Sequence, residues 1–176
     1  LRVLLGELTP DAGYLKIGHN VAFGYYDQGQ LLLSDANTVL EELKESYRLY
    51  TDTEMRSILG RFLFRGEEVF LPVGSLSGGE KARLSLLKLM LSGANTLILD
   101  EPTNHLDIEM TEWLEEYLGK SNATLLMVTH DRYFLDRVCN QIIEIDEFGL
   151  FSYSGNYAYY LEKREERIEN RNAAID

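Results

Sequence analysis

The feature that most constrains this chain is the stretch 76–107, in which two motifs flank a leucine-rich segment. The first motif is Leu-Ser-Gly-Gly-Glu at 76–80. Ser77 and Glu80 have the spacing of a capping box, so we predict a helix that begins there and ends near Gly93. Gly78 and Gly79 leave the first amides of this helix uncovered by side chains. Those amides and the positive end of the helix dipole indicate an anion site that suits phosphate.

The second motif begins with the apolar run 97–99, Leu-Ile-Leu, and ends in two acids, Asp100 and Glu101. An apolar run without polar alternation is typical of a parallel strand that is buried on both faces. Ligands of open parallel sheets bind at the carboxyl ends of the strands. Because successive strand residues point to opposite sides, we expect one acid near a metal and the other near a water.

Together these motifs resemble those of ATP-binding cassette (ABC) ATPase domains, with Leu76–Glu80 as the signature motif and Leu97–Glu101 as the Walker B strand. Pro102–Asp107 resembles the corresponding segment of the ABC-F branch, whose members are soluble, carry two cassettes in one chain and act on ribosomes. The resemblance implies an α/β fold: a P-loop NTPase-like parallel sheet core, a helical subdomain and antiparallel strands.

Composition agrees with an intracellular globular domain. The chain has 176 residues, about one domain's length, and its one cysteine, Cys139, excludes a disulfide framework, so we expect the cytoplasm. No apolar run approaches the roughly 20 residues of a membrane span. The net charge of −12 argues against a large nucleic-acid-binding surface on this segment.

The first 32 residues are expected to form the N-terminal part of the ATPase core. Leu1–Leu8 predicts a helix, and Gly13–Gly18 and Val21–Tyr26 predict two short strands. In the family a phosphate-binding P-loop comes immediately before such a helix, and this sequence contains none. We therefore interpret the chain as a cassette that starts after its P-loop, incomplete at the N-terminus and inactive alone.

Gln28 closes the second predicted strand. By resemblance it is the Q-loop glutamine, which reaches the magnesium and the attacking water. The alternative is a plain polar residue at a strand end. Residues 33–92 are expected to form the helical signature subdomain, in which Glu41, Glu42 and Glu45 predict a solvated helix face.

Residues 93–155 are expected to complete the core. After a helix over 110–118, Thr124–Thr129 predicts another buried strand, with His130 at its carboxyl end. His130 matches the family's switch histidine, and the alternative is a satisfied histidine at a helix start. Two antiparallel strands over 141–145 and 150–153 and a helix or linker over 156–176 follow.

The resemblance implies ATP hydrolysis with Mg²⁺ at a composite site. Asp100 then holds magnesium through water, with Gln28 close by, and Glu101 acts on the attacking water. His130 and Gln28 fix the geometry around the terminal phosphate.

The signature residues Ser77, Gly78, Gly79 and Glu80 are implied to cap ATP bound to a second cassette, and Asp107 belongs to the D-loop that links the two sites. The second cassette lies in the same chain of the intact protein or in a homodimer. The other implied partner is the ribosome, with its rRNA and tRNA.

Two other classes of function stay open at this point. One is the nucleotide-binding subunit of a membrane transporter. Two features argue against it: the sequence of Asn104–Asp107 and the Gly155–Tyr160 segment. The other is an interaction fragment without catalysis. Chromosome-maintenance ATPases also separate signature and Walker B from the P-loop, but there a long coiled coil precedes the signature, whereas here Gln28 and predicted strands do.

Overall fold

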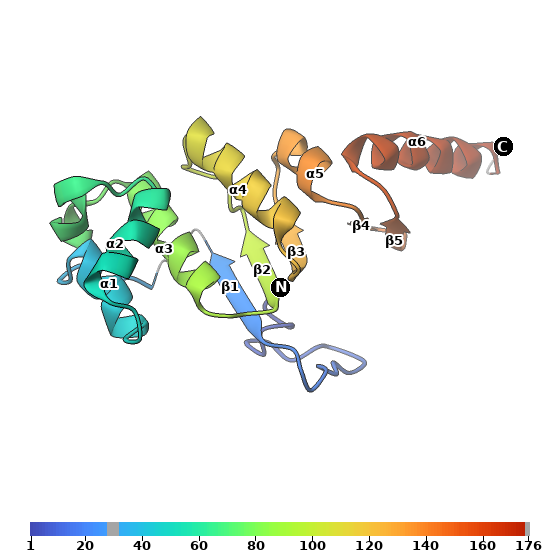
Figure 1. The fold of residues 1–176 in the computed structure, drawn as a ribbon. Coiled ribbons are helices and arrows are strands. Elements are labelled where there is room, and N and C mark those ends of the chain that lie inside the picture. The colour runs from blue at the N-terminus through green and yellow to red at the C-terminus, as the bar shows by residue number, and fades with distance from the viewer. Residues whose placement is uncertain (28–31, 175–176) are drawn as a thin grey trace. The chain divides into compact units, whose positions relative to one another are not determined.

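A computed structural model describes residues 1–27 and 32–174 of the chain (Figure 1). It divides into two compact units, which we describe separately. The first contains Leu1–Met110 and Asn122–Val128, and the second contains Thr111–Ser121 and Thr129–Asp176. The expected α/β class is confirmed, because the first unit holds a parallel sheet with helices and the second an antiparallel pair of strands with helices.

The sheet of the first unit consists of β1 (Phe23–Asp27), β2 (Thr96–Asp100) and β3 (Thr124–Val128), all parallel, with β2 in the middle. The three apolar residues of β2, 97–99, are buried as predicted, and its register places Asp100 beside Asp27 on β1. The prediction of a buried strand at 124–129 is wrong in part, because β3 is half-buried with exposed ends. Among the described strands β3 pairs only with β2, so it lies at the edge of this sheet.

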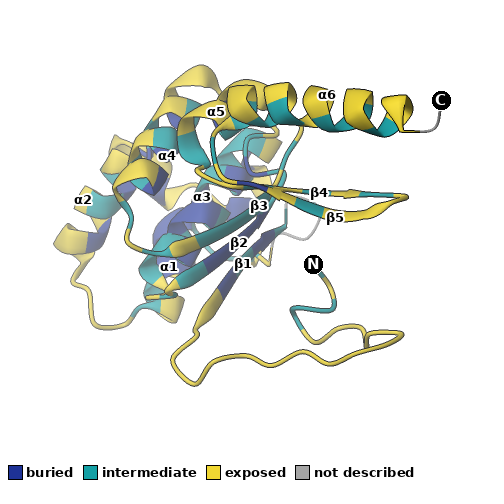
Figure 2. Cartoon of the chain, turned by 90° about the vertical axis from the view of Figure 1, so that its right-hand side faces the viewer, coloured by how far each residue is buried: buried dark blue, intermediate teal, exposed yellow. Residues whose placement is uncertain are grey.

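The helices of the first unit are α1 (Val39–Ser46), α2 (Asp52–Arg61) and α3 (Gly78–Leu91), with 3₁₀ turns at Gly66–Phe70 and Val73–Ser75. Each α-helix begins with a capping box, in which a threonine or serine and a glutamate three residues later satisfy each other's backbone amides. The helix predicted at Ser77 is therefore confirmed. The helices contribute buried apolar residues to the core, and buried residues are dark blue in Figure 2.

Glu42 corrects the expected solvated face of α1. It is 4% exposed, and its carboxylate lies 2.7 Å from Nζ of Lys88 on α3. The same carboxylate accepts hydrogen bonds from the Ser34 amide at 3.3 Å and from Asn37 Nδ2 at 3.0 Å. Sequence periodicity placed the charge on a helix face, but only the position of α3 turns that face inward.

The first 22 residues differ most from expectation. Leu1–Leu8 forms a series of turns instead of a helix, with Gly6 in the left-handed region at φ 75°. Gly13–Gly18 is not a strand, and residues 6–23 are exposed (Figure 2). A period-two pattern specifies a strand only where a neighbouring strand accepts its hydrogen bonds, and among the described residues none pairs with this segment.

The second unit contains most of α4 (Ile108–Lys120), α5 (Arg132–Val138), the hairpin of β4 (Ile142–Asp146) and β5 (Gly149–Tyr153), and α6 (Tyr157–Ala173). The predicted antiparallel strands and final helix are thus present. Arg167 of α6 binds Glu144 at 2.8 Å and Asp146 at 3.0 Å and covers the ring of Phe151. These contacts hold α6 against the hairpin. Within the described part of the chain, no helix is both long and apolar enough to cross a bilayer.

Candidate functional site

The carboxyl edge of the parallel sheet gathers acids. Asp100 is the last residue of β2, and Asp27 is its register partner at the end of β1. Burial raises the pKa of the Asp100 carboxyl, and the negative charges of Asp27 and Glu101 raise it further. The edge therefore carries a surplus of negative charge at neutral pH, which a bound cation would relieve.

Glu101 leaves the strand conformation immediately after β2. Its φ is 50°, in the left-handed region that non-glycine residues avoid at a cost of about 1–3 kcal/mol. Its amide donates a 2.8 Å hydrogen bond to the carbonyl of Val128, the last residue of β3. This contact holds the turn, so the direction of the Glu101 side chain follows from the turn and not from the simple alternation expected of a strand.

The signature motif and the D-loop meet in one cavity of about 230 Å³. Asp107 also caps α4, because its Oδ1 accepts a 2.8 Å hydrogen bond from the Met110 amide. As far as the described residues go, neither Asp100 nor Glu101 lines this cavity. Its lining residues are Ser77, Gly79, Glu80, Arg83, His105, Leu106 and Asp107.

The charges in this cavity follow from the capping box. The Ser77 amide donates to the Glu80 carboxylate at 2.7 Å, and Ser77 Oγ accepts from the Glu80 amide at 3.3 Å. The hydrogen bonds with Ser77, with the charge of Arg83, lower the pKa of Glu80. The ionised carboxylate is thus occupied at the cap, and the Arg83 guanidinium adds a positive charge beside the helix start.

Gln28 and His130 are the two other predicted site residues. Gln28 lies outside the described residues. His130 belongs to the second unit, where it is exposed between Thr129 and Asp131, the N-cap of α5. Its role as a switch stays a prediction.

A metal must be judged from the donors that are present. In the part of the chain that the structure describes, no three His, Cys, Asp or Glu side chains are grouped to hold an ion. Mg²⁺ at phosphate sites commonly uses one or two protein carboxylates, with phosphate oxygens and waters as the other ligands. Asp100, a hard oxygen donor at a negatively charged edge, fits that use.

Sequence reasoning missed three contributors. Asp27 stands beside Asp100, and only the β1–β2 register reveals it, although its place before Gln28 at a strand end was a usable signal. Arg83 enters the signature cavity because it lies one turn after Gly79 on α3. The backbone of His105 contacts that same turn, which no sequence pattern indicates.

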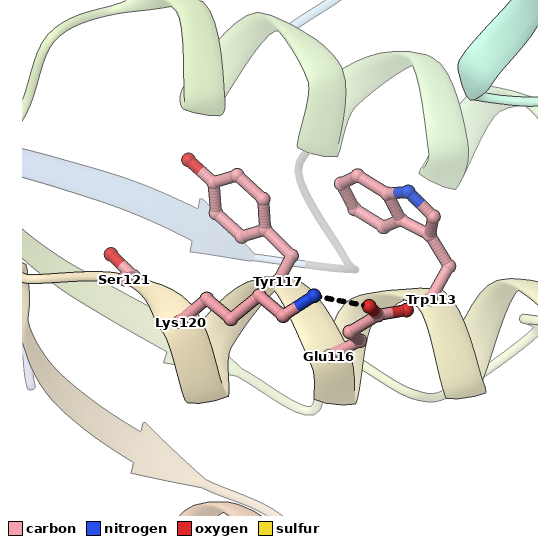
Figure 3. A pocket seen from close by; sticks show the side chains of 5 residues that line it. All are labelled: Trp113, Glu116, Tyr117, Lys120 and Ser121. Carbon is pink, nitrogen blue, oxygen red and sulfur yellow. Dashed lines mark hydrogen bonds and ion pairs between the residues drawn. The ribbon is translucent and has the colours of Figure 1, made fainter.

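A second cavity, of about 320 Å³, lies along the C-terminal half of α4 (Figure 3). Trp113 and Tyr117 stack there with ring centroids 5.2 Å apart, and Lys120 pairs with Glu116. Trp113 therefore packs, as its helical spacing suggests. The lining, Trp113, Glu116, Tyr117, Lys120 and Ser121, includes none of the predicted site residues.

A parallel sheet with acids at its carboxyl edge, joined to a glycine-rich helix start, defines an α/β protein of the P-loop NTPase-like class. The chain belongs to the ABC transporter family, whose family model matches residues 1–104. The resemblance to the ABC-F branch is also confirmed by its relatives.

Three curated relatives illustrate this. The chain is 50% identical to "Putative ATP-binding protein YdiF" of Bacillus subtilis over 96% of its length and 26% of the relative's. It is 41% identical to "ABC transporter F family member 5" of Arabidopsis thaliana, covering 93% of the chain and 24% of the relative. It is 40% identical to "Energy-dependent translational throttle protein EttA" of Mycobacterium tuberculosis, covering 87% of the chain and 26% of the relative.

The chain thus spans about a quarter of the length of these relatives. Among solved structures it resembles "RNase-L Inhibitor" with a TM-score of 0.66 and 24% identity, covering 88% of this chain and 31% of that one. This likeness supports the fold.

Proposed function

We propose that the chain is one ATP-binding cassette of an ABC-F type ATPase that acts on the ribosome in the cytoplasm. The family match supports ATP as the substrate. The relatives named for the F family and for energy-dependent translational throttling support translation as the process. The sequence of Asn104–Asp107 and the relatives named for translational throttling favour this reading over a transporter subunit.

In the proposed reaction the residues at the sheet edge have separate tasks. Asp100 would hold the Mg²⁺ of the nucleotide through water, and that ion would neutralise charge on the phosphates. The Glu101 carboxylate accepts a proton from the attacking water. The water oxygen forms a bond to the terminal phosphorus, the bond from that phosphorus to the ADP oxygen breaks, and phosphate and ADP leave.

Two further residues are assigned to the geometry of the terminal phosphate. His130 would contact the phosphate and orient the water, and Gln28 would help to hold the magnesium and that water. Phosphoryl transfer depends more on positioning and charge neutralisation than on covalent chemistry, so neither residue needs to react.

The signature cavity is assigned to a different nucleotide, one that a second cassette binds. Ser77 Oγ and the amides of Gly78 and Gly79 cap its phosphates at the start of α3, where the helix dipole favours negative charge. Glu80 holds this cap in shape, and Asp107 links it to the sheet edge. The separation of this cavity from Asp100 and Glu101 supports the composite arrangement.

ATP then joins two cassettes, from one parent chain or from a homodimer, and hydrolysis releases them. This is a two-state switch, because nucleotide binds across the closed pair. On the ribosome we propose that the closed state contacts rRNA and tRNA.

The observation that carries the ATPase proposal is the left-handed Glu101 held at the end of the central strand beside a carboxylate of raised pKa. The test uses the intact parent protein with Glu101→Gln. Because general base catalysis contributes typically about 10²–10⁴-fold, turnover should fall by at least about 100-fold while ATP binding persists. The variant should also accumulate on ribosomes in the presence of ATP, measured by co-sedimentation.

Glu116→Gln provides the matched control, since Glu116 is an exposed acid of α4 paired with Lys120. It should hydrolyse ATP and sediment like the wild type. Unchanged hydrolysis in Glu101→Gln would remove Glu101 from the base role. Equal sedimentation with and without ATP would refute the ribosomal part.

A further inference from the structure

An unusually close backbone contact joins the signature helix to the D-loop. A Cβ atom placed on Gly79, in the first turn of α3, would lie 2.6 Å from the carbonyl oxygen of His105. Ordinary contact begins at about 3.4 Å, so one side must move by about 0.8 Å. The same atom on Gly78 would meet nothing within 4 Å, and neither would one on Gly60 in α2. Added Cβ atoms on Gly24 and Gly155 would also come close to another atom, at 2.4 and 2.5 Å, but that atom belongs to a side chain. Gly79 differs from these two glycines because its close neighbour is backbone, which cannot turn aside as a side chain can.

The loop that carries His105 is short and internally bonded. Its start is fixed by the bond from the Glu101 amide to Val128, and the Asn104 amide bonds back to the Glu101 carbonyl at 3.3 Å. The Leu106 amide bonds to the Thr103 carbonyl at 3.2 Å. Asp107 ends the loop by capping α4. A loop with these internal hydrogen bonds cannot easily change its backbone conformation to accommodate a displacement.

His105 itself has a left-handed backbone, with φ at 63°. A histidine is restricted to a narrow part of that region, whereas a glycine there moves freely. The direction of the His105 carbonyl, which points at Gly79, is therefore set by a constrained residue in the middle of the loop.

We propose that Gly79 is a positioning residue for the loop of Glu101 and Asp107, in addition to any contact with phosphate. Its missing side chain lets the His105 carbonyl rest on the first turn of α3, so that the cap for one nucleotide and the Glu101 carboxylate that acts on the other move together. This rests on the proposed ATPase function, but the contact itself does not.

The proposal predicts different effects for neighbouring glycines of one motif. In Gly79→Ala the methyl group displaces the loop, and a misplacement of about 1 Å can cost on the order of 100-fold in rate. We expect kcat to fall by about 10- to 100-fold. Gly78→Ala leaves the loop in place, so its effect should appear mainly in KM through the phosphate cap.

The experiment uses the intact parent protein and three measurements. Steady-state ATPase kinetics separate kcat from KM. Hydrogen exchange of the peptide amides over 101–107 should accelerate in Gly79→Ala but match the wild type in Gly78→Ala and in Gly60→Ala, the folding control. In the Gly79→Ala background, His105→Gly should restore kcat at least about threefold, because the freed carbonyl can turn aside while Glu101 stays in place.

Unchanged exchange over 101–107 in Gly79→Ala would overturn the proposal, as would a lack of rescue by His105→Gly. If Gly79→Ala does not fold, the double variant must fold, and failure of both would also overturn it. A wild type without ATPase activity, or unchanged turnover in Glu101→Gln, would refute the proposed function instead, while the exchange measurement would still test the contact.

Discussion

The ion pair between Glu42 and Lys88 offers a sharp test of the packing in the first unit. The Glu42 side chain is 5% exposed and that of Lys88 is 24% exposed, so the two partners are unequally buried. Lys88→Met keeps the aliphatic stem and removes the charge. Breaking a buried pair in this way typically costs about 3–5 kcal/mol, because the remaining charge is left unpaired.

The structure places this case below that range. Glu42 keeps its bonds from the Ser34 amide and Asn37 Nδ2, and some water reaches the Lys88 end. We expect Lys88→Met to lower the free energy of unfolding by about 2–3 kcal/mol. Glu42→Gln should cost only about 1 kcal/mol, since the amide keeps a hydrogen bond and the Lys88 ammonium can turn towards solvent.

Urea unfolding followed by far-UV circular dichroism measures both values and the double variant. The double variant should be less destabilised than the sum of the single ones, by at least about 1 kcal/mol, because neither charge is then left alone. Equal losses below about 0.5 kcal/mol for both single variants would refute the reasoning, because that is the behaviour of a solvent-exposed pair.

Two other predictions concern β1 and β2. Asp100→Asn should raise the free energy of unfolding at pH 7. The pKa of Asp100 is raised in the folded state, so the charged carboxylate disfavours folding above that pKa. The gain in stability should vanish as the pH falls through this pKa, which denaturation at several pH values would measure. Tyr26→Phe should stabilise the fold by about 1 kcal/mol in thermal unfolding. Tyr26 is 2% exposed, burial raises its pKa to about 12, and its hydroxyl finds no hydrogen-bond partner among the described residues. A loss of stability of about 1 kcal/mol or more would mean that the hydroxyl does have a partner.

The parts of this protein that followed from sequence are those with local causes. The capping box of Ser77 and Glu80 needs only residues three apart, and it starts α3 where expected. The apolar run before Asp100 forms the central strand because no polar face constrains it to an edge. The residues of the Asn104–Asp107 motif were also enough to predict the resemblance to the ABC-F branch.

Two failures of sequence reasoning depend on parts of the chain that are distant in sequence. The alternation of Gly13–Gly18 resembles that of a strand, yet no described strand pairs with it. Glu42 has the sequence spacing of a surface acid, and Lys88, 46 positions away, makes it an internal one.

Sequence by itself determined the elements and the chemical types at the candidate site, because turns, caps and apolar runs are settled within a few residues of the chain. Tertiary structure alone decided the register that sets Asp27 beside Asp100, and the approach of the His105 carbonyl to Gly79. Those relations join segments some 26 to 73 positions apart, and only packing can specify the distance between such segments.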